Sequence, residues 1–280
     1  LEIAAQVGLC IPQTWQPRAG EDFAARVAAM HYPLVAKWAN PPEIMPVLEQ
    51  AGLEWLKTEY IRTPQELAAL LHRYAPVGHW PLIQQYCRGV GLGQMLYMDG
   101  GQATLRFQHR RLHEWPPEGG VSTLCRAEPT NAHAAQMLLS EALLRALEWQ
   151  GQAMVEYRYE AESGRYWLME VNGRFWGSLP LARHCGALFA WEAYRRTVLD
   201  QTDVAPTPRD TLRARYMVPE TKRLARVLLS PSRISDPFFQ RRPLADLTAY
   251  LLTFFDPRAR YYVFSLSDPR PWLRDMAQMF

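Results

Sequence analysis

Two glutamates in the second half of the chain lie on segments that predict a β-hairpin. Glu156 and Glu170 each sit in an apolar run, and Ser163 and Gly164 separate the two runs. If the turn is centred on Ser163 and Gly164 is left-handed, the glutamates face each other with Cβ atoms roughly 4.5–5.5 Å apart. Asn172, two residues beyond Glu170, shares its face because side chains alternate along a strand.

Opposed carboxylates repel, so this arrangement predicts a compensating cation. Mg²⁺ takes oxygen ligands and prefers one or two carboxylates together with substrate phosphates. Asn172 adds a neutral oxygen, and Arg174 is placed to bind a phosphate or carboxylate with two hydrogen bonds. Two solvated glutamates on an open sheet face are the alternative. The apolar neighbours and the polar ending Asn172-Gly173-Arg174 favour a site.

The composition is that of an ordinary globular protein. The 280 residues are 48% hydrophobic, and the net charge of +3 gives no case for nucleic acid as the main partner. No segment predicts a signal peptide or a membrane span, so a cytoplasmic protein is expected. The cysteines form no CxxC pair or common zinc spacing and are interpreted as reduced thiols. They are Cys10, Cys87, Cys125 and Cys185.

The hydrophobic patterns predict an α+β arrangement, with strands in hairpins and helices on one side. Asp99-Gly100-Gly101 predicts a hairpin turn. The glycines from Gly89 to Gly93 are interpreted as turn residues, because no helix with a P-loop lysine follows them. Strands are expected over 32–37, 82–87, 94–98, 103–109, 153–159 and 165–171. Helices are expected over 20–30, 42–51, 63–74, 131–149, 188–199 and 244–255.

Both ends of the chain have a distinct character. Residues 1–8 resemble the end of a helix that Gly8 stops, which leads us to expect a missing upstream segment. A polar linker is expected over 202–209, followed by a basic, aromatic and proline-rich tail. A helix of this tail packed on the rest of the protein is favoured, and contact with a membrane surface or a partner is the alternative.

The run from Leu168 to Arg174 resembles the "hydrophobic-E-x-N-x-R" signature of ATP-grasp ligases. Residues 32–37 resemble the first nucleotide-binding strand of that family, and residues 81–89 resemble its adenine hinge. His109-Arg110-Arg111-Leu112, followed by Gly119-Gly120-Val121-Ser122, resembles a segment of the carbamoyl-phosphate-synthase-like and D-aspartate-ligase-like carboxylate–amine ligases. The resemblance covers roughly residues 1–191 and lacks the N-terminal pre-ATP-grasp domain.

The resemblance implies an ATP-grasp fold, in which two α+β lobes grip ATP between antiparallel sheets. It implies an N-terminal lobe over 1–88, with the small lobe at roughly 20–85, and a C-terminal lobe with the metal site over 89–200. Residues 201–280 then form a C-terminal helical extension of unknown role.

The family roles are carried over where residues match. Glu156, Glu170 and Asn172 would hold Mg²⁺, with Mn²⁺ as an alternative. Arg174 would bind the transferred phosphate or an acyl phosphate. The remaining candidates are Lys37 and Lys57 for the ATP phosphates, Gln84, Gln85, Tyr86 and Cys87 for the adenine hinge, and His109 and Arg111 for a phosphate or substrate.

The chain departs from the family in two places. Gln85 replaces the usual hinge glutamate, and only Gly52 is available for the glycine-rich flap between Lys37 and Lys57. For His109 a purely structural, hydrogen-bonding role is an equal alternative. Arg111 is preferred to Arg110 because it shares the face of His109.

The resemblance implies an ATP-dependent carboxylate–amine ligase that forms an acyl phosphate and then a C–N bond. Its partners would be ATP, a small carboxylate, such as an amino acid, and an amine. A homodimer is compatible with this expectation. Two alternatives stay open, a nucleotide-binding module without turnover and a phosphotransferase on the same scaffold. The sequence does not identify the acid or the amine.

Overall fold

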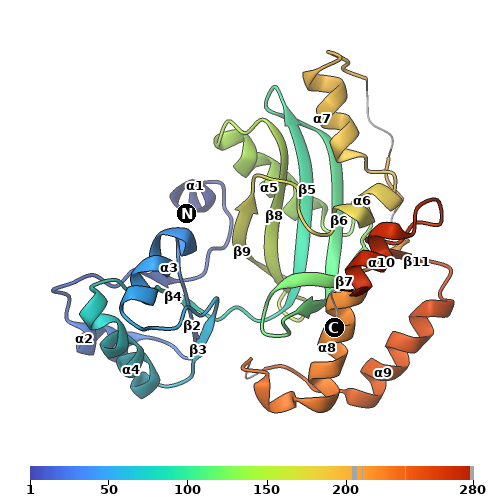
Figure 1. Cartoon of the computed structure of the whole chain (residues 1–280). Helices are drawn as coiled ribbons and strands as arrows, with labels where there is room; N and C mark the ends of the chain where they lie inside the picture. Colours follow the sequence, from blue (N-terminus) through green and yellow to red (C-terminus); the bar gives the residue numbers. More distant parts are fainter. Residues whose placement is uncertain (204–206, 210, 237, 278–280) are drawn as a thin grey trace. The chain divides into compact units, whose positions relative to one another are not determined.

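The computed structural model describes residues 1–203, 207–209, 211–236 and 238–277 (Figure 1). It divides into two compact units, each described here by itself. Unit 1 contains Leu1–Ile11, Arg88–Ile234 and Phe239–Phe280, and unit 2 contains Pro12–Cys87 and Ser235–Phe238. The linker predicted over 202–209 lies partly outside the described residues.

Unit 1 is built on a seven-stranded sheet with the order β11-β10-β7-β6-β5-β8-β9. Neighbouring strands are antiparallel except for β10 and β11, which are parallel. The strands are β5 (Val90–Asp99), β6 (Gln102–Trp115), β7 (Val121–Ala127), β8 (Gly151–Glu160), β9 (Arg165–Asn172), β10 (Arg213–Arg215) and β11 (Ala259–Tyr261).

The hairpin between β5 and β6 confirms the turn expected after Asp99. Asp99 pairs with Gln102, and the two loop residues Gly100 and Gly101 have φ values of +55° and +77°. Two consecutive positive φ angles match the right-handed twist of the strands and favour glycine.

Two expectations for this sheet are wrong. Gly91 and Gly93 lie inside β5 and are not turn residues, although Gly89 does precede the strand. The strand β7 was not predicted, because its sequence mixes polar and apolar residues and follows a Pro- and Gly-rich segment. Only a short connection separates β6 from β7, and β7 pairs with β6.

Helices cover both faces of the sheet, which corrects the expectation of helices on one side. One core joins Leu96 and Val155 of the sheet to Leu144 of α5 (Ala134–Ala146). The other joins alternate strand residues to Leu181 of α6 (Leu179–His184) and Phe189 of α7 (Phe189–Thr197). Because strand side chains alternate, β5 and β8 contribute to both cores.

Unit 2 is a smaller α/β layer around a four-stranded sheet with the order β1-β4-β2-β3. Its core includes Leu48, Leu67 and Ile83. Its strands are β1 (Thr14–Trp15), β2 (Leu34–Lys37), β3 (Glu59–Ile61) and β4 (Leu82–Gln85), and its helices are α2 (Phe23–Ala29), α3 (Pro41–Gln50) and α4 (Pro64–Tyr74).

Side-chain hydrogen bonds cap the start of α4. The Thr63 hydroxyl accepts from the Glu66 backbone N–H at 3.2 Å, and the Glu66 carboxylate accepts from the Arg62 N–H at 2.7 Å. These bonds satisfy N–H groups that have no partner inside the helix.

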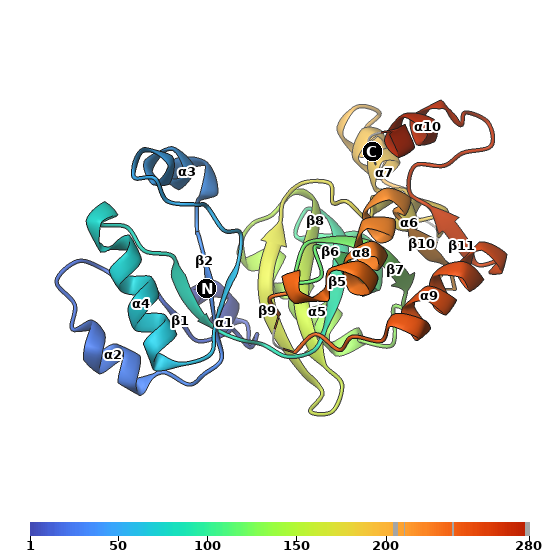
Figure 2. The same cartoon turned by 60° about the horizontal axis from the view of Figure 1, so that its bottom comes forward.

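The C-terminal extension carries α8 (Met217–Leu229), α9 (Pro243–Leu252) and α10 (Arg270–Ala277). α8 packs beside β6 and β7, and α9 packs against α8 (Figure 2). Buried Arg215 anchors this region, since its guanidinium lies 4.4 Å from the Tyr250 ring centroid and donates to the Tyr250 carbonyl at 2.9 Å. Among the described residues, no helix is long and apolar enough to span a membrane.

Candidate active site

The β8–β9 hairpin brings the two predicted glutamates face to face. Glu156 pairs directly with Glu170, as predicted, and Gly164 in the turn has a φ of +67°. The pairing between the turn and the glutamates differs from the prediction. Near the turn Glu160 pairs with Arg165, and an irregularity after Glu156 shifts the register by one residue, so that the glutamates still meet.

Asn172 joins the two carboxylates on the same face of the sheet. Its Nδ2 lies 2.8 Å from Glu170 Oε1 and 3.4 Å from Glu156 Oε1. Glu156 is 9% exposed, whereas Glu170 is exposed. The three side chains therefore converge at a point that opens to solvent on the Glu170 side.

Arg111 approaches this cluster from β6, across β5. Its Nη2 donates to Glu156 Oε1. The path across β5 exists because Gly91 has no side chain: a Cβ there would lie 2.7 Å from Arg111 Cδ. Gly93 plays the same part for His109, since a Cβ at Gly93 would lie 3.2 Å from His109 Cε1. We call this strip, formed by Gly91 and Gly93, the glycine lane.

Charges of opposite sign alternate outward from the glycine lane. Glu114 lies 3.9 Å from Arg111 and 3.5 Å from Arg158, measured between charged atoms. The four side chains therefore form a row of ion pairs in the order Arg158, Glu114, Arg111 and Glu156. Glu114 and Arg111, in the middle of the row, each lie between two side chains of opposite charge. Buried charges are tolerated when they are paired in this way.

Burial and neighbouring charges shift the pKa values of the central pair. Burial raises the pKa of Glu156 and nearby Glu170 raises it further, while Arg111 partly offsets both effects. Burial lowers the pKa of the Arg111 guanidinium, but Glu156 and Glu114 outweigh burial and raise it. Arg111 therefore remains a cation beside Glu156.

His109 lies on the same face as Arg111 but is fully buried, with 0% exposure. Both of its ring nitrogens are buried without a hydrogen-bond partner in the described structure. Burial, assisted by the Arg111 charge, lowers the pKa of His109 to about 3. The described structure therefore gives His109 no hydrogen bond through its ring nitrogens.

Arg174 and Gly173 follow β9 directly. Arg174 is exposed and donates from Nη1 to the Phe175 carbonyl at 3.1 Å. Gly173 packs against Trp149, since a Cβ at Gly173 would overlap the indole ring. The glycine between Asn172 and Arg174 is therefore a steric requirement of this chain.

The predicted phosphate-binding lysines both lie in unit 2. Lys37 is half-buried at the end of β2, where it pairs with Leu82 of β4. Lys57 is exposed in the segment before β3. The segment between them contains the proline-started helix α3 in place of a glycine-rich flap.

The predicted adenine hinge lies at the end of β4, and its first N–H groups are already used. The Gln85 N–H donates to the Gln13 carbonyl at 2.8 Å, and the Tyr86 N–H donates to the Pro33 carbonyl at 3.3 Å. The buried Gln84 side chain donates to the Thr14 hydroxyl at 2.9 Å. An adenine contact through either of these N–H groups would require its present bond to break.

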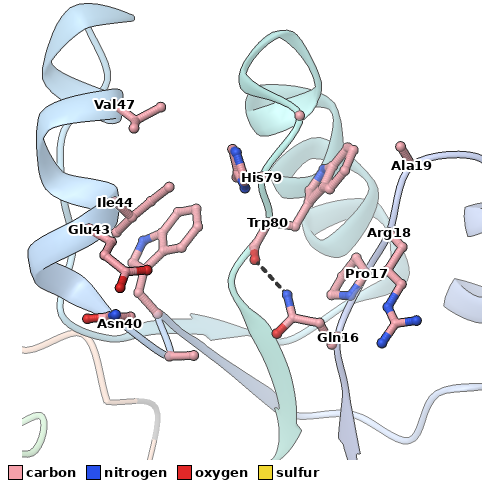
Figure 3. A pocket seen from close by; sticks show the side chains of 13 residues that line it. Gln16, Pro17, Arg18, Ala19, Asn40, Glu43, Ile44, Val47, His79 and Trp80 are labelled. Carbon is pink, nitrogen blue, oxygen red and sulfur yellow. Dashed lines mark hydrogen bonds between the residues drawn. The ribbon is translucent and has the colours of Figure 1, made fainter.

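A separate cavity of about 460 Å³ in unit 2 lies between α3 and the segments 16–19 and 78–80 (Figure 3). Trp38 and Trp80 line it, and on the side opposite α3 the Gln16 side chain donates to the Trp80 carbonyl at 3.1 Å. None of the predicted nucleotide-binding residues is among its lining residues.

Solved structures of several enzymes share this fold. An ADP complex of N5-carboxyaminoimidazole ribonucleotide synthetase matches 75% of this chain and 52% of its own, at 14% identity and a TM-score of 0.55. The Thermus thermophilus enzyme of the same name matches 76% of this chain and 54% of its own, at 15% identity and a TM-score of 0.54. A third structure is the biotin carboxylase domain of Hydrogenobacter thermophilus 2-oxoglutarate carboxylase, solved with MgADP and bicarbonate. It matches 76% of this chain and 47% of its own, at 11% identity and a TM-score of 0.55.

The chain has the ATP-grasp fold. It spans about half the length of these three ATP-grasp structures. A search of protein families finds no match, and a search of curated proteins finds none either.

The donor set fits the divalent cation that the ATP-grasp fold implies. Two carboxylates converge, and a cation would offset the repulsion and burial that raise the Glu156 pKa. Asn172 now turns its Nδ2 toward the glutamates, so it would have to present Oδ1 to become a ligand. Among the described residues no three His, Cys, Asp or Glu side chains form a metal-binding group.

Sequence reasoning missed the glycine lane and the partners Glu114 and Arg158 beside the two glutamates. A signal for the lane was present, because Gly89, Gly91 and Gly93 recur at every second position. Glycine repeated with the period of a strand indicates one face open to a close approach.

Proposed function

We propose that this protein is an ATP-dependent carboxylate–amine ligase. The observation that carries the proposal is the convergence of Glu156, Glu170 and Asn172 on one sheet face of an ATP-grasp fold. The fold by itself does not specify the reaction, because function depends on the site. Paired carboxylates joined to an amide, with Arg111 alongside, form a site suited to a metal-bound polyphosphate.

The proposed reaction has two steps. A substrate carboxylate oxygen attacks the γ-phosphorus of ATP, the bond from that phosphorus to the β–γ bridging oxygen breaks, and ADP leaves. The amine nitrogen then attacks the acyl carbon, the bond from that carbon to the phosphate oxygen breaks, and the amine loses a proton. The products are an amide, ADP and inorganic phosphate.

The chain's own residues would bind and position the reactants. Mg²⁺, or Mn²⁺ in its place, would neutralise the triphosphate while Glu156, Glu170 and Asn172 hold it. Arg111, fixed across the glycine lane, partly offsets the burial that raises the Glu156 pKa and sets the orientation of that carboxylate. Exposed Arg174 would bind the transferred phosphoryl group, and Lys37 with Lys57 would bind the phosphates of ATP.

For the substrates we propose a chemical class and not individual compounds. We favour a small carboxylate of the amino-acid type and an amine, both free in a cytoplasmic compartment. Exposed Arg174 suits a carboxylate substrate, and Arg111 lies nearby in its ion pair with Glu156. A phosphotransferase on the same scaffold would release a stable phosphorylated product in place of an amide.

A nucleotide-binding module without turnover is the second candidate, and one observation favours it. The segment between Lys37 and Lys57 folds into helix α3, whereas a flexible flap would be needed to exclude water from an acyl phosphate. ADP release that depends on both an acid and an amine would decide in favour of the ligase.

The test of the metal site uses Glu170→Gln, which keeps the side-chain shape and removes the charge. We expect wild-type protein to bind ADP more tightly with Mg²⁺ than without it, measured by titration calorimetry. Glu170→Gln should lose this Mg²⁺ dependence and all ATP turnover, while its circular dichroism stays unchanged.

Glu162→Gln is the matched control, since Glu162 is exposed in the turn of the same hairpin. It should behave as wild type. Wild-type Mg²⁺ dependence and turnover in Glu170→Gln would refute the metal assignment.

A further inference from the structure

Four residues of the C-terminal extension belong to unit 2. Ser235–Phe238, which we call the strap, groups with unit 2, while the chain on either side of it, to Ile234 and from Phe239, groups with unit 1. The chain therefore passes between the units four times, and the extension is covalently tied to the smaller unit at two points.

The strap has specific contacts within unit 2. Arg62 Nη2 donates to the Ser235 carbonyl at 3.2 Å. Ser235 also lines a cavity of about 470 Å³ formed by residues of β3 and α4. The Asp236 carboxylate accepts from the Phe238 N–H at 2.8 Å.

The Phe238 ring stacks on Tyr86. Their centroids are 4.7 Å apart and their planes differ by 26°. On β3, the Tyr60 ring lies 5.9 Å from Tyr86 at 59°. Tyr86 thus contacts one ring from the sheet of unit 2 and one from the strap. Aromatic pairs at these separations attract beyond the area that they bury.

Tyr86 is the first residue after β4, inside the predicted adenine hinge. Its backbone N–H bonds the Pro33 carbonyl at 3.3 Å, near the upper end of the usual range. The strand ladder ends at Gln85, and the Tyr86 ring packs between the rings of Tyr60 and Phe238 directly after it.

We propose that Phe238 is a positioning residue for nucleotide binding: the strap holds Tyr86, and Tyr86 holds the hinge in the shape that receives adenine. This inference rests on the proposed function. A hinge that is already ordered loses less conformational entropy when the nucleotide binds. The contribution should therefore be to nucleotide affinity, and not to the chemical step.

The test measures MgADP binding by calorimetry and, with the best acid–amine pair, KM for ATP and kcat. We expect Phe238→Ala to raise both the Kd for MgADP and the KM for ATP by about threefold to tenfold, from the loss of one aromatic pair. The kcat should stay close to the wild-type value. Phe238→Trp, which keeps an aromatic ring, should restore the affinity.

Phe255→Ala is the matched control, because Phe255 lies in the same extension and is 84% exposed. Unchanged or tighter MgADP binding in Phe238→Ala would overturn the proposal, as would an equal loss in Phe255→Ala or a fall in kcat at unchanged KM. These outcomes leave the proposed function intact if wild type binds MgADP. Absence of binding by wild type would instead refute both.

Discussion

Replacing His109 with glutamine should flatten the pH dependence of unfolding. His109 is fully buried, and burial together with Arg111 lowers its pKa from the ordinary 6.5 to about 3. Between these two values the unfolded chain binds a proton that the folded chain does not. Folding stability from this group is therefore fully present above pH 6.5 and is lost as the pH falls toward 3.

The size of the effect follows from the two pKa values. At pH 7 the unfolded histidine is mostly neutral, so the contribution to the free energy of unfolding is small. At pH 5 nearly all unfolded chains carry the extra proton, which favours unfolding by about 2 kcal/mol relative to pH 7. His109→Gln has no such proton, so its loss of stability from pH 7 to pH 5 should be smaller by about 2 kcal/mol.

Urea unfolding at pH 7 and pH 5 measures this difference. The comparison is made between pH values within each variant, so any constant cost of the substitution cancels. His31→Gln serves as the control because His31 is exposed. If His109→Gln and His31→Gln both lose as much stability as wild type, His109 is not held neutral in the interior.

Two further predictions concern single backbone positions. Gly91→Ala should destabilise by about 1–3 kcal/mol, because the new Cβ would lie 2.7 Å from Arg111 Cδ and push Arg111 away from Glu156. Gly177→Ala has no atom within 4 Å of its new Cβ, and its urea midpoint should match wild type; equal midpoints for both variants would contradict the glycine lane. Thr63→Ala removes the hydroxyl that caps α4 and should cost about 1 kcal/mol in thermal unfolding. Thr63→Ser should recover most of that loss, and a melting temperature for Thr63→Ala equal to wild type would show that the cap is unimportant.

The local features of this protein could be read from its sequence. The hairpin that carries Glu156 and Glu170 has a local signal, since two alternating strands flank a turn in which Gly164 supplies the left-handed residue. The Gly100-Gly101 turn has an equally local signal. These features depend on residues a few positions apart, whose conformations are limited by sterics and by short-range hydrogen bonds.

The predicted register of the carboxylate hairpin was right, but the reasoning behind it was incomplete. The pairing near the turn is set by Glu160 and Arg165, and the irregularity after Glu156 restores the predicted register. The extra residue of this irregularity, Met169, lies on the edge strand β9, which also pairs at Trp167 with Cys10 from the start of the chain.

Tertiary structure decided the features that join distant segments. β7 becomes a strand because β6 and β10 offer hydrogen-bonding edges on either side of it, although its own sequence favours no element. Arg111 reaches Glu156, 45 residues away, only because β5 lies between them with glycine at the crossing. The stack of Phe238 on Tyr86 likewise joins positions far apart in the chain. Local sequence determined which segments form strands and which form turns. Packing between distant segments determined which strands and side chains come together. That packing depends on the shape and charge of residues far apart in the sequence.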